Sequence, residues 1–481
     1  AGYGGSADAH HMVQPQDDGA GALAAMRAAL TDAGLVAGDI DYVNAHGTGT
    51  RQNDAMEARA LTTLFGKRRD VAVSSTKSMH GHTLGAAAAI EAATVVLGMT
   101  EGFVPPSAGV LQPTPELGSL TLVTRALVRA PRIALSPSFA FGGNNAALIF
   151  AHPDTLARPA PSRPRAPEPR CVISAATVAC GHGTSAEAAT IADWLEASLP
   201  PPSPARAGRT PATVLGASTV RRMDPLSQSI TAVASLTLTA SHAPTVARLG
   251  IGIGTSFGAM QPTRAFLARL FGKGPTLVNP LDFPNLVHNA PAGHAAIALG
   301  ARGLNLASCQ EETCADEALH ALLAALSEDA VDAALVAGGD LDDPSLAAGY
   351  AHVDRALGTA GSLHSVVGAL LLEEAASCTK REHRPWAEIL GVGRAGLHDG
   401  VRGAVGRALE QAALARHEAV TIDLWLRGAT DALMARHEAL AASLPALAAA
   451  KTLDARHVLG TAGGAGAAVV ADRSGHSRVP Q

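Results

Sequence analysis

Two glycine-framed loops that follow short apolar segments constrain this chain more than any other feature. The first loop, residues 46–50, reads His-Gly-Thr-Gly-Thr and follows the mostly apolar residues 40–43. The second loop, residues 77–85, begins at Lys77 and contains His82. Loops at the ends of buried strands commonly carry reactive side chains, because a rigid scaffold positions them. One histidine among 19 in the chain could be incidental in a Gly/Thr turn. Two imidazoles with an ammonium group instead indicate a site that stabilises negative charge on a substrate oxygen.

Length, charge and cysteine content narrow the class of protein. A chain of 481 residues with 47% hydrophobic and 16% charged residues predicts at least two domains with large buried interfaces. A net charge of -5 gives no basic surface for a nucleic-acid partner. We expect no membrane segment, because Glu91 interrupts the richest apolar run, residues 85–99. Five cysteines without metal-type spacing predict a reducing, cytoplasmic location.

Alternating helical and strand patterns over the first 150 residues predict a layered α/β fold. A helix is expected over residues 19–34, ending at Gly34, and a small-residue helix over residues 85–97. Strands are expected over residues 40–43, 71–74, 133–135 and 146–150, the last two joined by a glycine turn.

A proline-rich segment divides the chain. Residues 153–170 contain six prolines and no apolar period, so they predict a linker between domains. Beyond it we expect strands over residues 171–175, 250–254 and 331–339 and helices over residues 291–303 and 311–326. Residues 421–425 then repeat the pattern of residues 40–43, and residues 451–460 repeat that of residues 77–85. Two copies of one half-domain are therefore predicted, with a different half between them at residues 171–345.

Two other motifs are weak. Residues 250–254 read Gly-Ile-Gly-Ile-Gly, but the spacing is not that of a dinucleotide-binding fingerprint, so a tight strand exit is favoured. The histidine pairs at residues 10–11 and 80–82 have no accompanying cysteine or carboxylate cluster, so no metal site is predicted.

Residues 1–152 resemble the C-terminal half of a beta-ketoacyl-acyl-carrier-protein synthase, of the thiolase-like superfamily. The resemblance rests on residues 46–57, 75–87 and 139–145, which match in order and spacing. It implies a thiolase-like five-layered α/β/α/β/α fold. In this chain that fold would comprise one C-terminal half-domain (1–152), the linker (153–170), and a complete but degenerate domain made of residues 171–345 and 346–475.

The resemblance also implies a site of one cysteine and two histidines. His46 and His82 would hold the thioester oxygen of malonyl carrier protein during decarboxylation, and Lys77 would pair with Glu57 to fix the histidine geometry. Further positions implied to contact substrate are Thr48 and Thr50, on the phosphopantetheine arm, and Phe141 and Phe139, on a gating loop. No cofactor would be permanently bound, since the substrates travel on phosphopantetheine of an acyl carrier protein. The nucleophilic cysteine is expected upstream of residue 1, so this fragment alone is expected to be inactive.

Residues 171–470 resemble a whole synthase subunit whose site has degenerated. Glu312 falls at the nucleophile position, and a carboxylate cannot replace a thiol in acyl transfer. Cys309 and Cys314 are displaced from that position by two or three residues. The first histidine is replaced by Arg427 or, in an alternative alignment, by Gly428. Lys451 and His457 would survive, so this domain resembles a chain length factor, the silent partner of a ketosynthase.

We therefore expect part of a beta-ketoacyl synthase of fatty acid or polyketide biosynthesis, fused to a silent partner. Its partners would be acyl carrier protein, acyl and malonyl thioesters, and a synthase dimer or pseudo-dimer partner. One alternative is a non-catalytic scaffold or chain-length-determining subunit, and a second is a malonyl-carrier decarboxylase. A thiolase acting on coenzyme A esters is disfavoured by residues 47–50 and 141–143.

Overall fold

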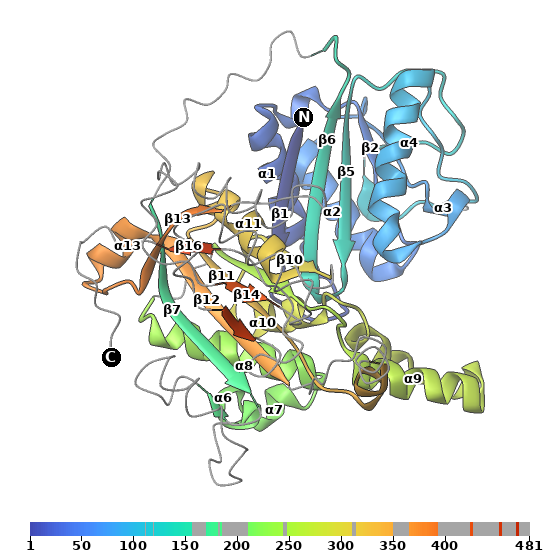
Figure 1. Cartoon of the computed structure of the whole chain (residues 1–481). Helices are drawn as coiled ribbons and strands as arrows, with labels where there is room; N and C mark the ends of the chain where they lie inside the picture. Colours follow the sequence, from blue (N-terminus) through green and yellow to red (C-terminus); the bar gives the residue numbers. More distant parts are fainter. Residues whose placement is uncertain are drawn as a thin grey trace. The chain divides into compact units, whose positions relative to one another are not determined.

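The computed structural model describes residues 1–110, 112–118, 120–155, 170–180, 183–184, 210–243, 248–309, 314–349, 365–392, 424–426, 452–454 and 468–470. The chain divides into two compact units (Figure 1). The first comprises Ala1–Pro167 with Arg302–Asn305, and the second comprises Glu168–Ala301 with Leu306–Gln481. The domain boundaries inferred from the sequence stay predictions, and most of the expected linker lies outside the described residues.

The first unit is built on a mixed six-stranded sheet in the order β1-β6-β5-β2-β3-β4. Strands β5, β2, β3 and β4 run parallel to one another, whereas β6 and β1 add an antiparallel edge beside β5. The strands expected from the sequence are confirmed, and β1 and β4 were not expected. Their bounds are β1 (Gly2–Ala7), β2 (Tyr42–Asn44), β3 (Ala72–Ser74), β4 (Thr121–Leu122), β5 (Ile133–Ala140) and β6 (Asn144–Ala151).

Glycine and hydroxyl-bearing residues cap helices of the first unit. Helix α1 ends at Gly34, which adopts φ 65°, and its N–H donates to the carbonyls of the last turn, as the sequence predicts. Thr50 begins α2, because its side chain accepts from the Asn53 N–H. The helical bounds are α1 (Ala20–Ala33), η1 (Ala37–Asp39), α2 (Arg51–Phe65), α3 (Lys77–His80), η2 (Leu84–Ala86), α4 (Ala87–Glu101), η3 (Pro115–Leu117) and η4 (Phe141–Gly143).

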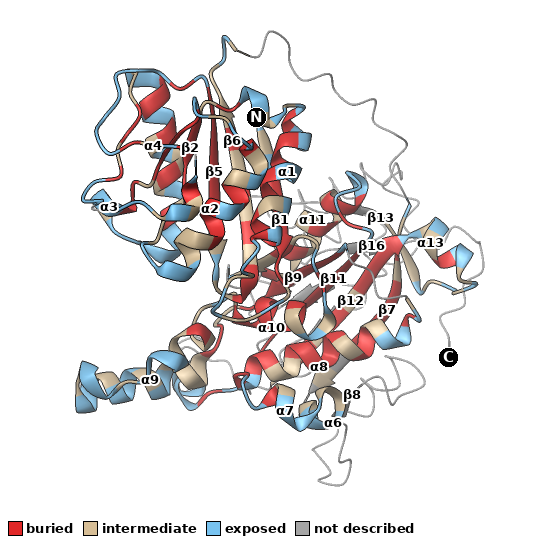
Figure 2. Cartoon of the chain, turned by 180° about the vertical axis from the view of Figure 1, so that it is seen from behind, coloured by how far each residue is buried: buried red, intermediate tan, exposed pale blue. Residues whose placement is uncertain are grey.

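Alternate residues of the central strands face two separate cores. Val43 and Leu135 pack with α1 and α2 on one face of the sheet. Tyr42 and Ala134, one residue earlier in each strand, pack with Val95 of α4 on the other face. This alternation follows from the two-residue period of a strand, and it gives the unit an α/β/α layering. Figure 2 shows the buried strands between helices whose outer sides are exposed.

The second unit contains an eight-stranded sheet with the path β10-β9-β11-β12-β7-β13-β16, and β8 pairs with β7. The predicted strands and helices of residues 171–339 are confirmed, although β7 extends five residues beyond residue 175. The strands are β7 (Cys171–Cys180), β8 (Gly183–Thr184), β9 (Leu249–Gly254), β10 (Asn305–Ser308), β11 (Ala333–Asp340), β12 (Val366–Glu374), β13 (Ala387–Val392) and β16 (Ala468–Val470), with a separate parallel pair, β14 (Leu424–Leu426) and β15 (Thr452–Asp454). The helices are α6 (Pro211–Leu215), α7 (Ala217–Val220), α8 (Pro225–Ala240), α9 (Met260–Lys273), η6 (Pro275–Leu277), η7 (Pro280–Asn285), α10 (Ala290–Leu299), α11 (Cys314–Ser327) and α13 (Ala375–Lys380).

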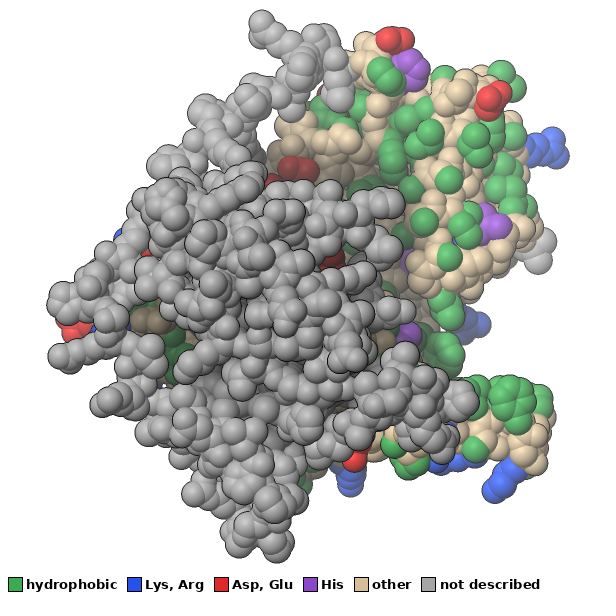
Figure 3. All heavy atoms as spheres, viewed as in Figure 1, with side chains coloured by type: hydrophobic (Ala, Val, Ile, Leu, Met, Phe, Trp, Pro, Cys, Tyr) green, Lys and Arg blue, Asp and Glu red, His purple; other side chains and the backbone are tan. Residues whose placement is uncertain are grey.

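One apolar helical stretch corrects an expectation from the sequence. Within the described residues, Leu84–Glu101 is long and apolar enough to cross a membrane by length and composition. Glu91, inside this stretch, is fully buried and forms an ion pair with Lys77, so we interpret α4 as a layer of the α/β fold. Val96 and Leu97 on its outward face are 47% and 56% exposed. Figure 3 shows apolar side chains over this part of the first unit.

Candidate functional site

Two parallel neighbouring strands deliver the two loops to one edge of the first sheet. Strand β2 pairs with β3 in parallel, with Asn44 opposite Ser74. His46 follows β2 by two residues, and Lys77 follows β3 by three and begins α3. Because the carboxyl ends of parallel strands meet at the same edge, the loops converge there. The structure therefore brings together His46, Lys77 and His82.

His46 is the centre of this cluster. Its side chain is buried, with 6% exposed, and its ring lies 5.6 Å from that of His82 at an interplanar angle of 89°. The ring of Phe139 lies 5.4 Å away on another side. Burial, reinforced by the charges of Lys77 and His82, lowers the pKa of His46 to about 3. The imidazole is therefore neutral at physiological pH.

The proton of His46 can be assigned to one ring nitrogen. Lys77 Nζ lies 3.3 Å from His46 Nδ1. An ammonium group only donates, so Nδ1 must accept and the proton of the neutral ring lies on Nε2. His46 is thus a neutral N–H donor held by a cation behind it.

His82 is the more accessible of the two imidazoles. Its side chain is exposed, and partial desolvation, followed by the charge of Lys77, lowers its pKa. A lowered pKa favours the neutral ring, which can also donate one N–H. The perpendicular rings of His46 and His82 can therefore approach one acceptor atom from two directions.

Lys77 is ion-paired with Glu91 of α4, which corrects the expected pairing with Glu57. The side chains of Lys77 and Glu91 are 4% and 0% exposed. Burial raises the pKa of Glu91, and the hydrogen bond and charge of Lys77 oppose that rise. In the sequence, Glu91 is recognisable only as an interruption of an apolar run. A lone carboxylate in an Ala-rich buried helix was the signal available for finding it.

Glu57 has a different partner, the backbone of the His46 loop. Its two carboxylate oxygens accept from the N–H groups of His46 (2.7 Å) and Gly47 (2.8 Å). Burial raises the pKa of Glu57 to about 7, although both N–H donors oppose the rise. Gly47 adopts φ 42°, and a Cβ there would lie 2.4 Å from Ser75 Cβ, so the loop requires glycine. Glu57 therefore fixes the backbone of the loop, while Lys77 fixes the ring of its histidine.

The remaining residues predicted in the first unit lie around this cluster. Thr48 and Thr50 share a hydroxyl contact of 3.2 Å at the start of α2. Phe141 begins the short helix η4, directly after the strand that carries Phe139. The predicted roles of these four side chains in substrate binding remain proposals.

The predicted degenerate site is largely beyond what the structure describes. Glu312, Arg427, Lys451 and His457 all lie outside the described residues. The strand pair β14–β15 is nevertheless parallel, as β2–β3 is.

The predicted repeat stays a prediction, because Lys451 lies outside the described residues. Arg427 and Gly428, the two alternatives at the first histidine position, also lie outside the described residues, so both alignments stay open.

The two candidate replacement thiols of the second unit are poorly suited to nucleophilic attack. Burial, followed by the charge of Asp340, raises the pKa of Cys314 to about 11 and also raises that of the exposed Cys309. A raised pKa lowers the fraction of reactive thiolate.

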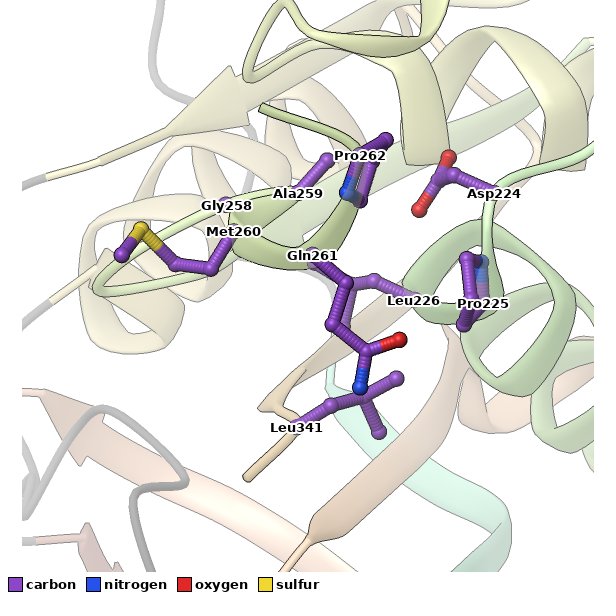
Figure 4. Close-up of a pocket in the computed structure, with 9 residues that line it drawn as sticks. All are labelled: Asp224, Pro225, Leu226, Gly258, Ala259, Met260, Gln261, Pro262 and Leu341. Carbon is purple, nitrogen blue, oxygen red and sulfur yellow. The ribbon is translucent and has the colours of Figure 1, made fainter. Parts of the chain in front are cut away.

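A small pocket of the second unit lies between the starts of α8 and α9, and none of its lining residues is a predicted site residue (Figure 4). It is lined by Asp224, Pro225, Leu226, Gly258, Ala259, Met260, Gln261, Pro262 and Leu341. Among the described residues, no group of three or more His, Cys, Asp or Glu side chains is arranged to hold a metal ion.

Comparisons with known proteins agree with the family resemblance. The model of the beta-ketoacyl synthase C-terminal domain matches residues 1–111, and the model of the N-terminal domain matches residues 209–366. Nodulation protein E of Rhizobium sp. (strain N33) is 48% identical over 151 residues, which are 31% of this chain and 37% of that protein. The mitochondrial 3-oxoacyl-[acyl-carrier-protein] synthase of Arabidopsis thaliana is 47% identical over 157 residues, 31% of this chain and 33% of that protein. The chain spans about a third of the length of these curated relatives.

One solved structure is similar in fold to nearly the whole chain. The structure of the PfaC keto synthase–chain length factor matches with a TM-score of 0.71 and 17% identity, over 95% of this chain and 56% of that one. At this identity the match shows the fold alone. The predicted thiolase-like α/β fold is thereby confirmed.

Proposed function

Because this chain belongs to the beta-ketoacyl synthase family, we propose that its first unit supplies the charge-stabilising half of a decarboxylative condensation. In this reaction malonyl carrier protein loses carbon dioxide, and the resulting carbanion attacks an acyl thioester. The observation that carries the proposal is the 3.3 Å contact from Lys77 Nζ to His46 Nδ1, which leaves the Nε2 proton of a neutral imidazole available to substrate.

The proposed chemistry depends on that neutral donor. When the carbon–carboxylate bond of the malonyl group breaks, its electron pair passes into an enolate, and negative charge develops on the thioester oxygen. Preorganised N–H donors aimed at such an oxygen each contribute about 2.7–4 kcal/mol to lowering the barrier. His46 and His82, with perpendicular rings 5.6 Å apart, are suited to donate to one oxygen together.

The enolate then attacks an acyl group held as a thioester, and the thiol is released as the leaving group. Residues 1–170 contain no cysteine, so this thiol must come from another segment of protein. The alternative function, a non-catalytic scaffold or chain-length-determining subunit, would need no such thiol. We propose that the second unit is the silent, chain-length-factor-like partner, and its high-pKa Cys314 supports this role.

The proposed partner is an acyl carrier protein in the cytoplasm. Its phosphopantetheine arm would reach His46 past Thr48 and Thr50, whose hydroxyls are exposed and lie 3.2 Å apart. No permanently bound cofactor is needed, because the arm itself brings both the acyl and the malonyl group. A second synthase subunit or pseudo-dimer partner completes the proposed assembly.

The test uses the full-length natural polypeptide with radiolabelled malonyl carrier protein and an acyl carrier protein. We expect His46→Ala and His82→Ala each to lower the condensation rate about 100- to 1,000-fold. His152→Ala, at the exposed end of the first sheet, is the matched control and should not change the rate. Unchanged product yield in both site variants would refute the catalytic proposal and support the scaffold.

The same assay distinguishes condensation from the third possible function, a malonyl-carrier decarboxylase based on the second unit. Carbon dioxide release by the double variant His46→Ala/His82→Ala at the wild-type rate would support that function. Loss of carbon dioxide release together with condensation would exclude it.

A further inference from the structure

His80, a third histidine of the same loop, has no part in the chemistry proposed above. It is the last residue of α3, and both of its ring nitrogens have partners. Nδ1 lies 2.9 Å from the carbonyl oxygen of Gly81, and Nε2 lies 3.0 Å from Thr76 Oγ1. A carbonyl only accepts, so the proton of the neutral ring lies on Nδ1. His80 Nε2 must then accept, and the Thr76 hydroxyl donates to it.

The hydrogen bonds continue inward from Thr76. With its proton given to His80, Thr76 Oγ1 accepts from Asn44 Nδ2 at 3.4 Å. The same amide nitrogen donates to the main-chain oxygen of Glu91 at 3.3 Å. Thr76 and Asn44 are both fully buried, so neither can exchange these partners for water. The chain of bonds thus runs in one direction, from Asn44 through Thr76 to His80.

This series of hydrogen bonds connects the three segments that hold His46, the proposed catalytic donor. Thr76 immediately precedes Lys77, and Asn44 ends β2 two residues before His46. The main-chain oxygen bound by Asn44 belongs to Glu91, whose side chain holds Lys77. If the Thr76 hydroxyl turned its proton toward the Asn44 amide, two donors would face each other. Thr76 thus links the segment that leads to Lys77 with the segment that leads to His46, and the side chains of Lys77 and His46 are in contact.

We propose that His80 is a positioning residue for His46: its Nε2 lone pair sets the direction of the Thr76–Asn44 hydrogen bonds that place Lys77 and Glu91 behind the catalytic imidazole. The inference rests on the function proposed for His46, but it is tested by a property of the ring that can be measured without turnover. His80 itself contacts neither substrate nor the reacting atoms in this account.

The test is a set of three substitutions that separates the two ring nitrogens. His80→Gln keeps an acceptor at the place of Nε2, His80→Asn keeps only a polar group at the place of Nδ1, and His80→Ala keeps neither. Thr76→Val removes the hydroxyl at the next step of the chain. His152→Ala is the control for the loss of an imidazole elsewhere in the first unit.

The readout is the protonation of His46 in the full chain labelled with ¹⁵N-histidine, followed by long-range ¹H–¹⁵N spectra. We expect wild type, His80→Gln and His152→Ala to show His46 with its proton on Nε2. In His80→Asn, His80→Ala and Thr76→Val we expect the ratio of the Nε2–H to the Nδ1–H form to fall about two- to tenfold, the loss that one hydrogen bond implies.

Two outcomes would overturn the proposal. A wild-type spectrum of His46 in all three His80 variants would show that the ring does not position it. An equal change in all three, His80→Gln included, would show that His80 acts by filling space rather than through its Nε2 acceptor. Because no substrate is used, a failure here is distinguishable from a failure of the condensation assay.

Discussion

Removing the carboxylate of Glu91 should destabilise the first unit far more than removing an exposed carboxylate. Glu91 and Lys77 form a buried ion pair whose side chains are 0% and 4% exposed. In Glu91→Gln the ammonium group of Lys77 would stay buried without its counter-charge. Breaking a buried pair in this way costs about 3–5 kcal/mol of unfolding free energy. The matched control is Glu116→Gln, which breaks the exposed pair with Arg59 and should cost about 0.2–1 kcal/mol.

The assay must report on the first unit alone. The three tryptophans, Trp194, Trp386 and Trp425, all lie beyond residue 155, so intrinsic fluorescence does not report on this unit. Hydrogen exchange followed by mass spectrometry, on peptides covering residues 42–46 and 87–101 in increasing guanidinium, measures its opening free energy. The double variant Lys77→Met/Glu91→Leu should recover most of the loss, because an apolar pair of similar volume is often as stable as a buried ion pair. A cost for Glu91→Gln no larger than that for Glu116→Gln would refute the reasoning.

Three further predictions concern the loop that carries the buried imidazole. Gly47→Ala should cost about 1–3 kcal/mol, because φ is 42° and the new Cβ would lie 2.4 Å from Ser75 Cβ; Gly38→Ala, where the nearest atom is 3.7 Å away, should cost less than 1 kcal/mol in the same exchange assay, and equal costs would contradict the prediction. Thr50→Ala should lose about 1 kcal/mol by removing the cap of α2, while Thr50→Ser should keep it; thermal unfolding that fails to separate the two variants would argue against the cap. Burial raises the pKa of Glu57 from 4.5 to about 7, so the folded unit retains a proton that the unfolded chain releases, and its stability should fall as pH rises from about 4.5 through 7. Denaturation at several pH values should show a shallower fall in Glu57→Gln, and an unchanged slope would count against this assignment.

Much of the first unit follows from local sequence patterns. Apolar runs bounded by glycine predict β2, β3, β5 and β6, because each run is short and its alternate residues face two different cores. The convergence of His46 with Lys77 follows from the rule that parallel strands end at one edge. The edge strand β1 was missed because its residues Gly2–Ala7 are mostly small and carry little hydrophobic pattern.

The residues that hold His46 and Lys77 in place could not be predicted from local sequence patterns. Glu57 and Glu91 are both buried carboxylates near Lys77, and the sequence does not say which of them the ammonium group selects. The fold decides it, because the backbone N–H groups of His46 and Gly47 occupy both oxygens of Glu57. Glu91 is left to neutralise Lys77 from the opposite face of the sheet. Such a choice depends on contacts between elements, which local periodicity does not encode.

The sheet of the first unit separates two controls over a single imidazole. From the α2 side, Glu57 holds the main chain that carries the ring, and Lys77, ion-paired with Glu91 of α4, sets the ring's hydrogen-bonding state. Substitutions in the α2 layer can therefore change the position of the His46 ring without changing which nitrogen carries its proton. Substitutions in the α4 layer can change the protonated nitrogen without changing the position of the ring. A protein arranged in this manner can change the reach of its donor and the strength of its donor in independent evolutionary steps.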